Sequence, residues 1–364
     1  MKFNAVLDDI VSYEAGKPIE LVVRDFGIKS KDVVKLASNE NPYGCSPKVQ
    51  AAVTMVIGNM ALYPDDSMMH LKTALSQKFD VNENEIIVGA GSDQVIELAV
   101  HAKVSKGSKV LMNSITFAMY EIYAKQVGAE IVRTASREHD LEEFYELYLE
   151  HKPEIIFICT PNNPTGDAID ANELKAFLDK IDSETLVLVD GAYMEYTRFK
   201  DESKSVTPKE LVDAYDNVLY LGTFSKAYGL GGMRVGYGIA RADIIQAFYK
   251  LRPPFNITTL TLEAATVALD DEAFVQDCIA KSFAEMDRYH EFALKHNIEV
   301  IESFTNFVTL VFDANRSASK LAQELLERGM IVRDLKSYGL NAIRVTIGTP
   351  AQNDRFFELA DSLL

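Results

Sequence analysis

A lysine and an arginine in one loop rich in small residues are the side chains of this sequence best suited to chemistry. Lys226 follows an apolar, strand-like run at 217–224, and Arg234 comes after several glycines on the same segment. A lysine amine can form a Schiff base with an aldehyde, and an arginine guanidinium binds phosphate through two parallel hydrogen bonds. The pair therefore predicts pyridoxal 5'-phosphate (PLP), although Ser-Lys followed by glycines also occurs in ordinary strand-to-loop turns.

Asp190 could serve the opposite end of such a cofactor. It ends the apolar run 186–189, and Tyr193 follows three residues later. A carboxylate there can pair with a protonated pyridine nitrogen, and opposite charges about 4 Å apart attract by about 4 kcal/mol at an effective dielectric constant of ~20. The alternative is that Asp190 caps the N-terminus of the next helix.

The segment 89–93 is a candidate phosphate cup. It follows an apolar run at 85–88, places Ser92 and Asp93 at the start of a helical stretch, and contains two glycines. The unpaired backbone N–H groups of a helix N-terminus bind phosphate well. No third glycine follows at the spacing of a dinucleotide-binding motif, so a Rossmann site is not predicted. A purely structural turn is the alternative.

Two further candidates also follow strand-like runs. Asn163 lies in the turn 161–166 after the run 155–158, and Phe117 comes after the run 109–112. The amide of Asn163 could donate a hydrogen bond to a phenolate-like oxygen, and the ring of Phe117 could stack on a cofactor. Asn-Pro and Thr-Gly are also common turn pairs, and a lone phenylalanine is more often a core residue.

The elements that must position these side chains alternate along the chain. From about residue 85 to 240, short apolar runs are separated by amphipathic helical stretches. This pattern predicts a mostly parallel sheet covered by helices on both faces, and such sheets bind ligands at the carboxyl ends of their strands. Beyond a boundary at 252–254, helices and three strand candidates at 307–312, 330–333 and 342–347 predict a smaller α/β domain.

Composition narrows the class of partner. The 364 residues carry a formal net charge of −17, which argues against nucleic acid or an anionic membrane as the main partner. The three cysteines are widely separated and form neither a metal nor a disulfide pattern, so no metal is expected. The chain begins without an apolar segment of signal-peptide length, and no later run could span a bilayer, which predicts a cytoplasmic protein.

Motifs spread over nearly the whole chain occur in a specific order. They are 13–18, 38–44, 62–65, 91–93, 161–166, 189–193, 225–234 and 343–349. Together they resemble the fold-type I PLP-dependent enzymes, specifically the class I/II aminotransferases, and within these the histidinol-phosphate aminotransferases. The resemblance implies an α/β fold with a mostly parallel sheet between helices and a smaller α/β C-terminal domain. It divides the chain into an N-terminal arm of the small domain (1–34), a large PLP-binding domain (35–250) and a small domain (251–364).

The resemblance also implies a role for each candidate residue. Lys226 would hold PLP as a Schiff base and act as general base and acid, with Asp190 on the pyridine nitrogen and Tyr193 on the ring oxygen. The other cofactor-binding residues would be Ser92, Asp93, Phe117, Asn163, Thr223, Ser225 and Arg234, with Tyr63 reaching in from the neighbouring subunit of a homodimer. Substrate would be bound by Tyr13, Asn163, Arg333 and Arg344.

The reaction so implied moves the amino group of L-histidinol phosphate to 2-oxoglutarate through a ping-pong cycle of the cofactor, a step of histidine biosynthesis. Its partners would be a small amino donor and a 2-oxo acid.

Two arginines flanked by apolar residues on adjacent strands, Arg333 and Arg344, are costly to bury without anions, so they predict a shared anion site. Solvated surface arginines are the alternative.

The chain departs from the family pattern at a few positions. Leu62 stands where the family commonly has arginine and Gly191 where it has glutamate, while Phe117 and Phe255 often are tyrosines. These differences leave the amino donor open. An aromatic amino acid aminotransferase is the main alternative, and a PLP-dependent decarboxylase of a phosphorylated amino acid is a more distant one.

Overall fold

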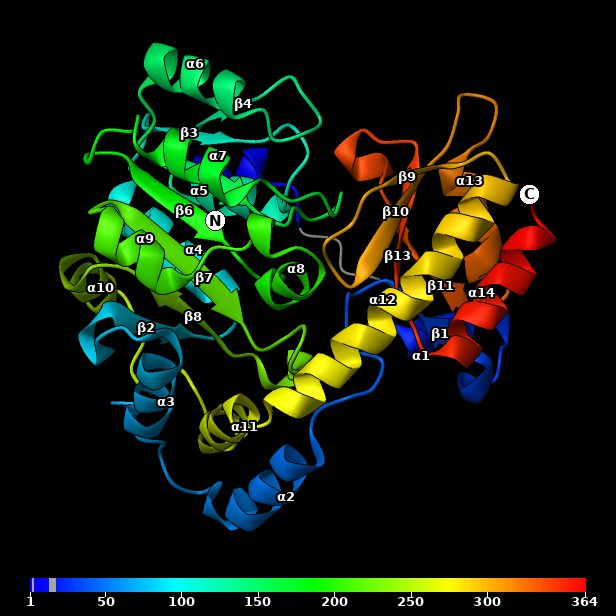
Figure 1. Cartoon of the computed structure of the whole chain (residues 1–364), viewed down its shortest axis with the longest axis horizontal. Helices are drawn as coiled ribbons and strands as arrows, with labels where there is room; N and C mark the ends of the chain where they lie inside the picture. The colour runs from blue at the N-terminus through cyan, green and yellow to red at the C-terminus, as the bar shows by residue number, and fades with distance from the viewer. Residues whose placement is uncertain (2, 13–17) are drawn as a thin grey trace.

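A computed structural model describes residues 1, 3–12 and 18–364 and shows a larger and a smaller layered region side by side (Figure 1). The larger region contains a seven-stranded sheet in the order β2-β8-β7-β6-β5-β3-β4. All neighbouring strands are parallel except β8, which is antiparallel to β2 and β7. The strands are β2 (Ile86–Gly89), β3 (Lys109–Met112), β4 (Glu130–Arg133), β5 (Ile155–Cys159), β6 (Leu186–Asp190), β7 (Val218–Thr223) and β8 (Gly236–Ile239). The expected mostly parallel sheet is confirmed.

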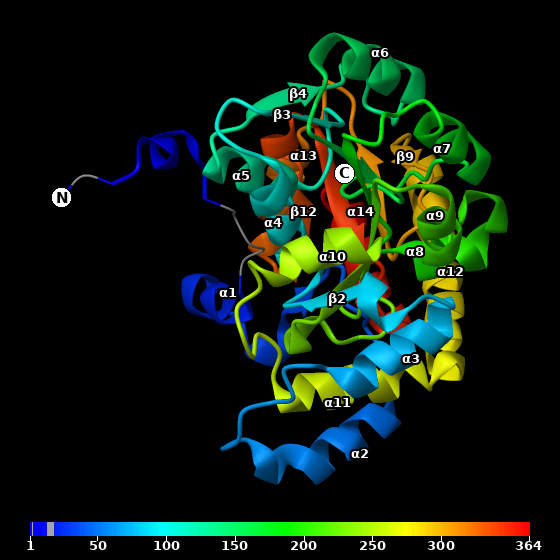
Figure 2. The same ribbon diagram turned by 90° about the vertical axis from the view of Figure 1, so that its left-hand side faces the viewer.

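Helices cover both faces of this sheet because successive side chains of a strand point to opposite faces. In β6, Leu186 and Leu188 pack with helices on one face, whereas Val187 and Val189 pack with helices on the other. Figure 2 shows α4 and α5 on one side of the sheet and α7 and α9 on the other. The first face is covered by α4 (Ser92–Lys103), α5 (Ala118–Gln126) and α10 (Ala242–Tyr249); the second by α6 (Leu141–His151), α7 (Ala171–Leu178) and α9 (Pro208–Ala214).

The smaller region contains a four-stranded antiparallel sheet in the order β12-β13-β10-β9. The long helix α12 joins the two regions, since Val275 and Ile279 belong to the core of the larger one and Met286 and Tyr289 to the core of the smaller. The elements of the smaller region are α12 (Glu272–Lys295), β9 (Glu299–Ile301), β10 (Phe307–Val311), α13 (Ala318–Leu326), β12 (Arg333–Asp334), β13 (Ala342–Thr346) and α14 (Pro350–Asp361). A smaller α/β unit follows the large sheet, as expected.

The prediction of one strand over 330–333 is wrong. Met330–Ile331 forms β11, which pairs in parallel with β1 (Val34–Lys35), whereas Arg333 begins β12 beside β13. The chain steps from one sheet to the other at Val332, and the uniform apolar run gives no sign of this step. Through β1 the N-terminal part of the chain is attached to the smaller region, while the proposed boundaries at 34 and 250 stay predictions.

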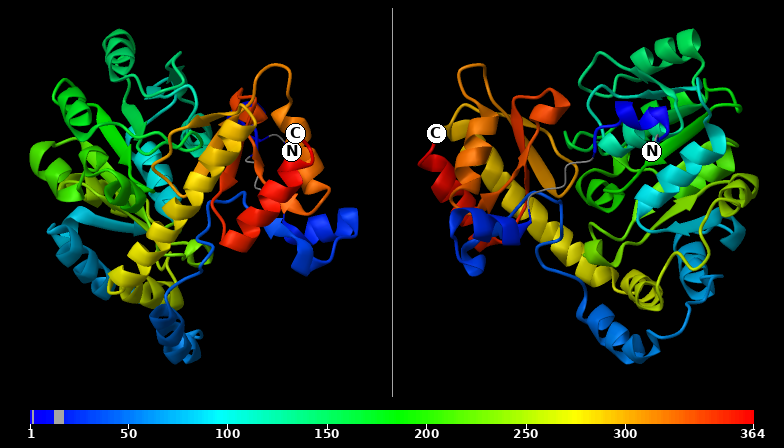
Figure 3. Two further views of the ribbon diagram at one scale, coloured as in Figure 1. Left: turned by 45° about the vertical axis from the view of Figure 1, so that its right-hand side comes forward. Right: turned by 180° about the vertical axis from the view of Figure 1, so that it is seen from behind.

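The remaining helices lie around the large sheet and at the N-terminus. Figure 1 shows α2 and α11 at one end of the molecule, where they pack against each other, and Figure 3 shows the N-terminal 3₁₀ helix η1 beside α5. These elements are η1 (Ala5–Asp9), α1 (Ile19–Phe26), α2 (Pro47–Val56), α3 (Met69–Phe79), α8 (Met194–Lys200) and α11 (Thr259–Leu269). Among the described residues, none of the helices combines the length and the apolar character needed to cross a membrane.

Candidate active site

A cavity of about 390 Å³ opens at the carboxyl ends of β5, β6 and β7. The last residues of these strands, Cys159, Asp190 and Thr223, line it because parallel strands end at one edge of a sheet. The cofactor-binding candidates that line it are Ser92, Asp93, Phe117, Asn163, Asp190, Tyr193, Thr223, Ser225, Lys226 and Arg234. The other lining residues are Gly91 and Ala192, which lie in the predicted motifs 91–93 and 189–193, and Met119 and Cys159, to which sequence reasoning gave no role in the site.

The amine of Lys226 lies in this cavity, three residues beyond the end of β7. Its Nζ donates a hydrogen bond to the backbone oxygen of Ser38 at 3.3 Å. Burial lowers the pKa of Lys226 to about 8, and the positive charges of Arg344 and Arg234 act in the same direction. At pH 7 about a tenth of the amine is therefore uncharged and nucleophilic.

Asp190 is a buried carboxylate whose two oxygens are both hydrogen-bonded. Oδ2 accepts from the hydroxyl of Tyr120 at 2.6 Å, and Oδ1 accepts from the backbone N–H of Ala192 at 3.1 Å. Burial raises the pKa of Asp190, and the hydrogen bond from Tyr120 is the largest effect that opposes it. The capping alternative for Asp190 is wrong, because the N-cap of α8 is Tyr193.

The first turn of α4 and the guanidinium of Arg234 form the end of the cavity suited to a phosphate. Arg234 donates to Ser225 Oγ at 3.5 Å and to the backbone oxygen of Ala90 at 3.4 Å. Gly91 has a positive φ of 83°, and a Cβ atom there would lie 2.5 Å from Arg234 Nη2. Glycine is therefore required at position 91 for the arginine to reach the loop.

Asp93 stands in the same first turn and carries a carboxylate into the cavity. Its Oδ2 accepts a hydrogen bond from the hydroxyl of Tyr123 at 2.9 Å, whereas Oδ1 is buried and has no hydrogen-bond partner among the described residues. Burial raises the pKa of Asp93. A buried carboxylate oxygen without a hydrogen-bond partner, such as Asp93 Oδ1, is expected where a bound ligand supplies the missing hydrogen bond.

Asn163 and Arg344, which come from different regions of the fold, are in contact. A guanidinium nitrogen of Arg344 donates to Asn163 Oδ1, and the other donates to the backbone oxygen of Ala37 at 2.8 Å. Arg344 is only 7% exposed and lies over the ring of Phe307. It stands directly behind the cavity wall, so the reading of Arg344 as a solvated surface residue is wrong.

The hydroxyl of Tyr193 is held by a residue to which sequence reasoning gave no role. Asn39 donates from Nδ2 to the Tyr193 oxygen at 2.8 Å, and its Oδ1 accepts from Thr346 on β13 at 3.1 Å. Asn39 has a φ of 55°, a conformation that asparagine tolerates better than most residues. The motif 38–44 was noted as a whole, but its sequence did not reveal this contact.

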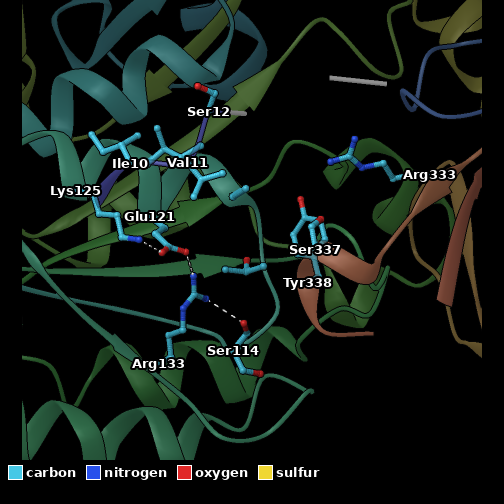
Figure 4. Close-up of a pocket in the computed structure, with 13 residues that line it drawn as sticks. Ile10, Val11, Ser12, Ser114, Glu121, Lys125, Arg133, Arg333, Ser337 and Tyr338 are labelled. Carbon is cyan, nitrogen blue, oxygen red and sulfur yellow. Dashed lines mark hydrogen bonds and ion pairs between the residues drawn. The ribbon is translucent and has the colours of Figure 1, made fainter. Parts of the chain in front are cut away.

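A second cavity, of about 520 Å³, lies between the N-terminal segment and the smaller region (Figure 4). It is lined by Ile10–Ser12, by the outer face of α5 and by Arg333, which faces it from the β12 side. Arg333 and Arg344 lie on the adjacent strands β12 and β13, as predicted, and are register partners there. Arg333 nevertheless lines this second cavity, whereas Arg344 adjoins the first. Tyr13 lies outside the described residues.

Tyr63 stands apart from both cavities. It is 82% exposed, and its ring lies 4.8 Å from the ring of Phe255. The described chain therefore brings together every cofactor-binding candidate except Tyr63.

The residues of the first cavity fit PLP. They supply a partly neutral amine for the aldehyde, a buried carboxylate for the ring nitrogen, and a helix N-terminus with a guanidinium for the phosphate. Within residues 1, 3–12 and 18–364, no group of three or more histidine, cysteine or acidic side chains is arranged to hold a metal ion. The amine, the carboxylate and the phosphate-binding end of the cavity together match an organic phosphate that carries an aldehyde.

Comparison with known proteins extends this match over the whole chain. The profile of a family described as "Aminotransferase class I and II" matches residues 31–359. A histidinol-phosphate aminotransferase of Sulfurimonas denitrificans is 64% identical, over 100% of both chains. One of Aliarcobacter butzleri is 60% identical, over 100% of this chain and 99% of that one. The crystal structure of histidinol-phosphate aminotransferase from Sinorhizobium meliloti, in complex with pyridoxal-5'-phosphate, matches 100% of this chain and 98% of that chain with a TM-score of 0.89 at 25% identity.

Proposed function

This chain belongs to the class I and II aminotransferases, a family of PLP-dependent enzymes, and from that premise we propose that it moves the amino group of L-histidinol phosphate to 2-oxoglutarate. The observation that carries the proposal is the convergence of Lys226, Asp190 and Asn163 on one cavity, with Arg344 directly behind it. The full-length relatives named as histidinol-phosphate aminotransferases support this choice of donor and a place in histidine biosynthesis.

When bound, PLP supplies an electron sink for negative charge at the carbon that carries the amino group. In our proposal the Nζ atom of Lys226 holds the cofactor and later accepts and returns the proton of that carbon. Its pKa of about 8 suits both directions of transfer near neutral pH. Asp190 keeps the ring nitrogen protonated, and Tyr193 and Asn163 donate hydrogen bonds to the ring oxygen.

The same proposal assigns the rest of the cavity to binding the cofactor. The first turn of α4 and the side chains of Arg234 and Ser225 receive the phosphate. Phe117, the N-cap residue of α5, covers one face of the ring. The phosphate-binding set is Ser92, Asp93, Thr223, Ser225 and Arg234.

Substrate anions are assigned to the arginines of the smaller region. L-Histidinol phosphate carries a phosphate and 2-oxoglutarate carries two carboxylates, and all of these pair well with guanidinium groups. We assign the anions of the donor, and then those of the acceptor, to three residues: Arg344 beside the first cavity, Arg333 in the second, and Tyr13. Because the same residues would bind the donor and then the acceptor, we propose ping-pong kinetics.

We also propose that the active unit is a homodimer in which Tyr63 reaches the neighbouring cofactor phosphate. Large apolar side chains are exposed on and near the α2–α3 connection, including Met55, Met60, Leu62 and Tyr63, with Phe255 beside Tyr63. A cluster of this kind on a soluble chain is typical of a surface that another protein covers. A cytoplasmic location stays a prediction.

A half-reaction screen tests the proposed donor. Holoenzyme without an acceptor is mixed with L-histidinol phosphate, L-phenylalanine or O-phospho-L-threonine, and loss of the visible absorbance of the Lys226-bound cofactor is followed. We expect L-histidinol phosphate to react at least about tenfold more efficiently than L-phenylalanine, and 2-oxoglutarate to restore the absorbance. A preference for L-phenylalanine would assign an aromatic amino acid aminotransferase instead. Release of carbon dioxide from phosphothreonine, with the absorbance retained, would assign a decarboxylase.

A further inference from the structure

Helix α5 separates the two cavities and turns a different face to each. Phe117, Tyr120 and Tyr123 are spaced three residues apart and lie on the side of the first cavity. Glu121 and Lys125 line the second cavity, where they form an ion pair (Figure 4). Residues three and four apart share a helix face, so the three aromatic residues form one surface toward the cofactor site.

Tyr120 is the fully buried member of this surface. Its ring stacks on Phe157 of β5 with the centroids 4.7 Å apart and the planes 11° from parallel, and it meets the ring of Phe117 edge-on at 5.5 Å. Its hydroxyl donates the hydrogen bond of 2.6 Å to Asp190 Oδ2. Because the ring is clamped between two other rings, the hydroxyl is held at a fixed point relative to the sheet edge.

Among residues 1, 3–12 and 18–364, two groups donate a hydrogen bond to the Asp190 carboxylate, and the hydroxyl of Tyr120 is one of them. The other is the backbone N–H of Ala192, on the opposite oxygen. Among the charged neighbours of Asp190, Asp93 raises its pKa and Lys226 lowers it. The two donors orient the plane of the carboxylate and stabilise its negative charge against burial.

We propose that Tyr120 is a positioning residue that keeps the Asp190 carboxylate ionised and aimed into the cavity, so that a proton shared with the pyridine nitrogen stays on the nitrogen. This inference rests on the proposed pairing of Asp190 with that nitrogen. A carboxylate that loses a hydrogen-bond donor in a buried site becomes more basic and takes a larger share of the proton. Tyr120 does not line the cavity and acts only through Asp190.

The test uses holoenzyme loaded with PLP that carries ¹⁵N at the ring nitrogen, with no amino donor present. In Tyr120→Phe the ring and its stacking stay, and only the hydroxyl is lost. We expect the ¹⁵N chemical shift to move toward the unprotonated position, and the dissociation constant for PLP to rise about tenfold to a hundredfold, the scale of one hydrogen bond to a charged group.

Tyr289→Phe is the matched control. Tyr289 is also fully buried and its hydroxyl also donates a side-chain hydrogen bond, to Asn353 Oδ1 at 2.9 Å, but it lies in the core of the smaller region. It should lower thermal stability without moving the ¹⁵N signal. In an Asp190→Asn background, Tyr120→Phe should leave the signal where Asp190→Asn alone puts it.

An unchanged ¹⁵N signal in Tyr120→Phe, with a stability loss like that of Tyr289→Phe, would reduce Tyr120 to a packing residue and overturn the inference. A signal that moves in Tyr120→Phe equally with and without the Asp190 carboxylate would also overturn it. Because no amino donor is used, a wrong choice of substrate in the proposed function would leave this result unaffected.

Discussion

The guanidinium of Arg344 donates a hydrogen bond to the side-chain oxygen of Asn163, and this contact joins β13 of the smaller region to the turn after β5. With its oxygen so engaged, Asn163 has its amide nitrogen left for the cavity that it lines. A residue predicted to bind substrate thus also orients a residue predicted to bind cofactor. The residues predicted to bind substrate and those predicted to bind cofactor therefore share a wall of the site.

Changes at Arg344 should affect substrates much more than cofactor. In Arg344→Gln the dissociation constants of donor and acceptor in the half-reactions should rise about a hundredfold or more, because a charge-assisted contact is lost. Arg344→Lys keeps the charge but not the paired donors, and should recover less than about a tenth of the lost affinity. Stopped-flow half-reactions measure both values. Equal losses for PLP and for substrate would contradict this division of roles.

Capture of PLP by the apo-protein should depend on pH through Lys226. Only the neutral amine reacts, so the rate constant should rise with pH and level off above about pH 8. This is the pKa of Lys226, which burial and the positive charge of Arg344 lower to about 8. In Arg344→Gln, which removes a nearby positive charge, the midpoint should move upward. Lys226→Ala should show no covalent capture at any pH. A rate that keeps rising beyond pH 10 in the wild type would show that the amine is not perturbed.

Gly229 should be far less tolerant of substitution than another glycine with a similar backbone. It has a φ of +68°, and a Cβ atom there would lie 2.0 Å from the backbone oxygen of Gly44. Gly339 has a φ of +76° and open space around the Cβ position. Gly339→Ala should cost about 1–2 kcal/mol of unfolding free energy from backbone strain alone, whereas Gly229→Ala should cost more and also weaken PLP retention. Urea denaturation and PLP titration measure both effects, and equal costs would refute the close contact.

Mixed dimers can show whether Tyr63 serves the neighbouring site. Lys226→Ala and Tyr63→Ala chains are each expected to be nearly inactive. In a hybrid dimer, one site would combine Lys226 of one chain with Tyr63 of the other, so reassociated mixtures should recover about a quarter of wild-type sites. The control mixes Lys226→Ala with Asp190→Asn, whose residues belong to one chain's site, and should recover none. No recovery in the first mixture would place Tyr63 in its own subunit's site, and a fully active Tyr63→Ala chain would place it in neither site.

Much of the site could be predicted because it depends on local sequence. The runs that form β5, β6 and β7 are recognisable as buried strands, and residues that follow parallel strands must meet at one sheet edge. Asp190 and Lys226 were found in this way. Tyr120 could have been found too, since it lies one helical turn beyond Phe117 in a stretch predicted as helix.

Other features depend on packing between distant segments. A family-typical glutamate is replaced by Gly191 here, and a Cβ atom at that position would lie 2.5 Å from the hydroxyl of Tyr220 on the neighbouring strand. The split of 330–333 between two sheets likewise depends on β1, which lies far away in the sequence. No local pattern reports either contact.

By itself the sequence determined the order of the elements, the family resemblance and the side chains at the ends of the parallel strands, because hydrophobic periodicity and strand-end motifs are local properties. Only the tertiary structure decided that Tyr120 holds Asp190, that Asn39 holds Tyr193, and that Arg344 and Arg333 face different cavities. Each of these depends on which side chains from separate elements fill the same space, and that is settled only when those elements pack together.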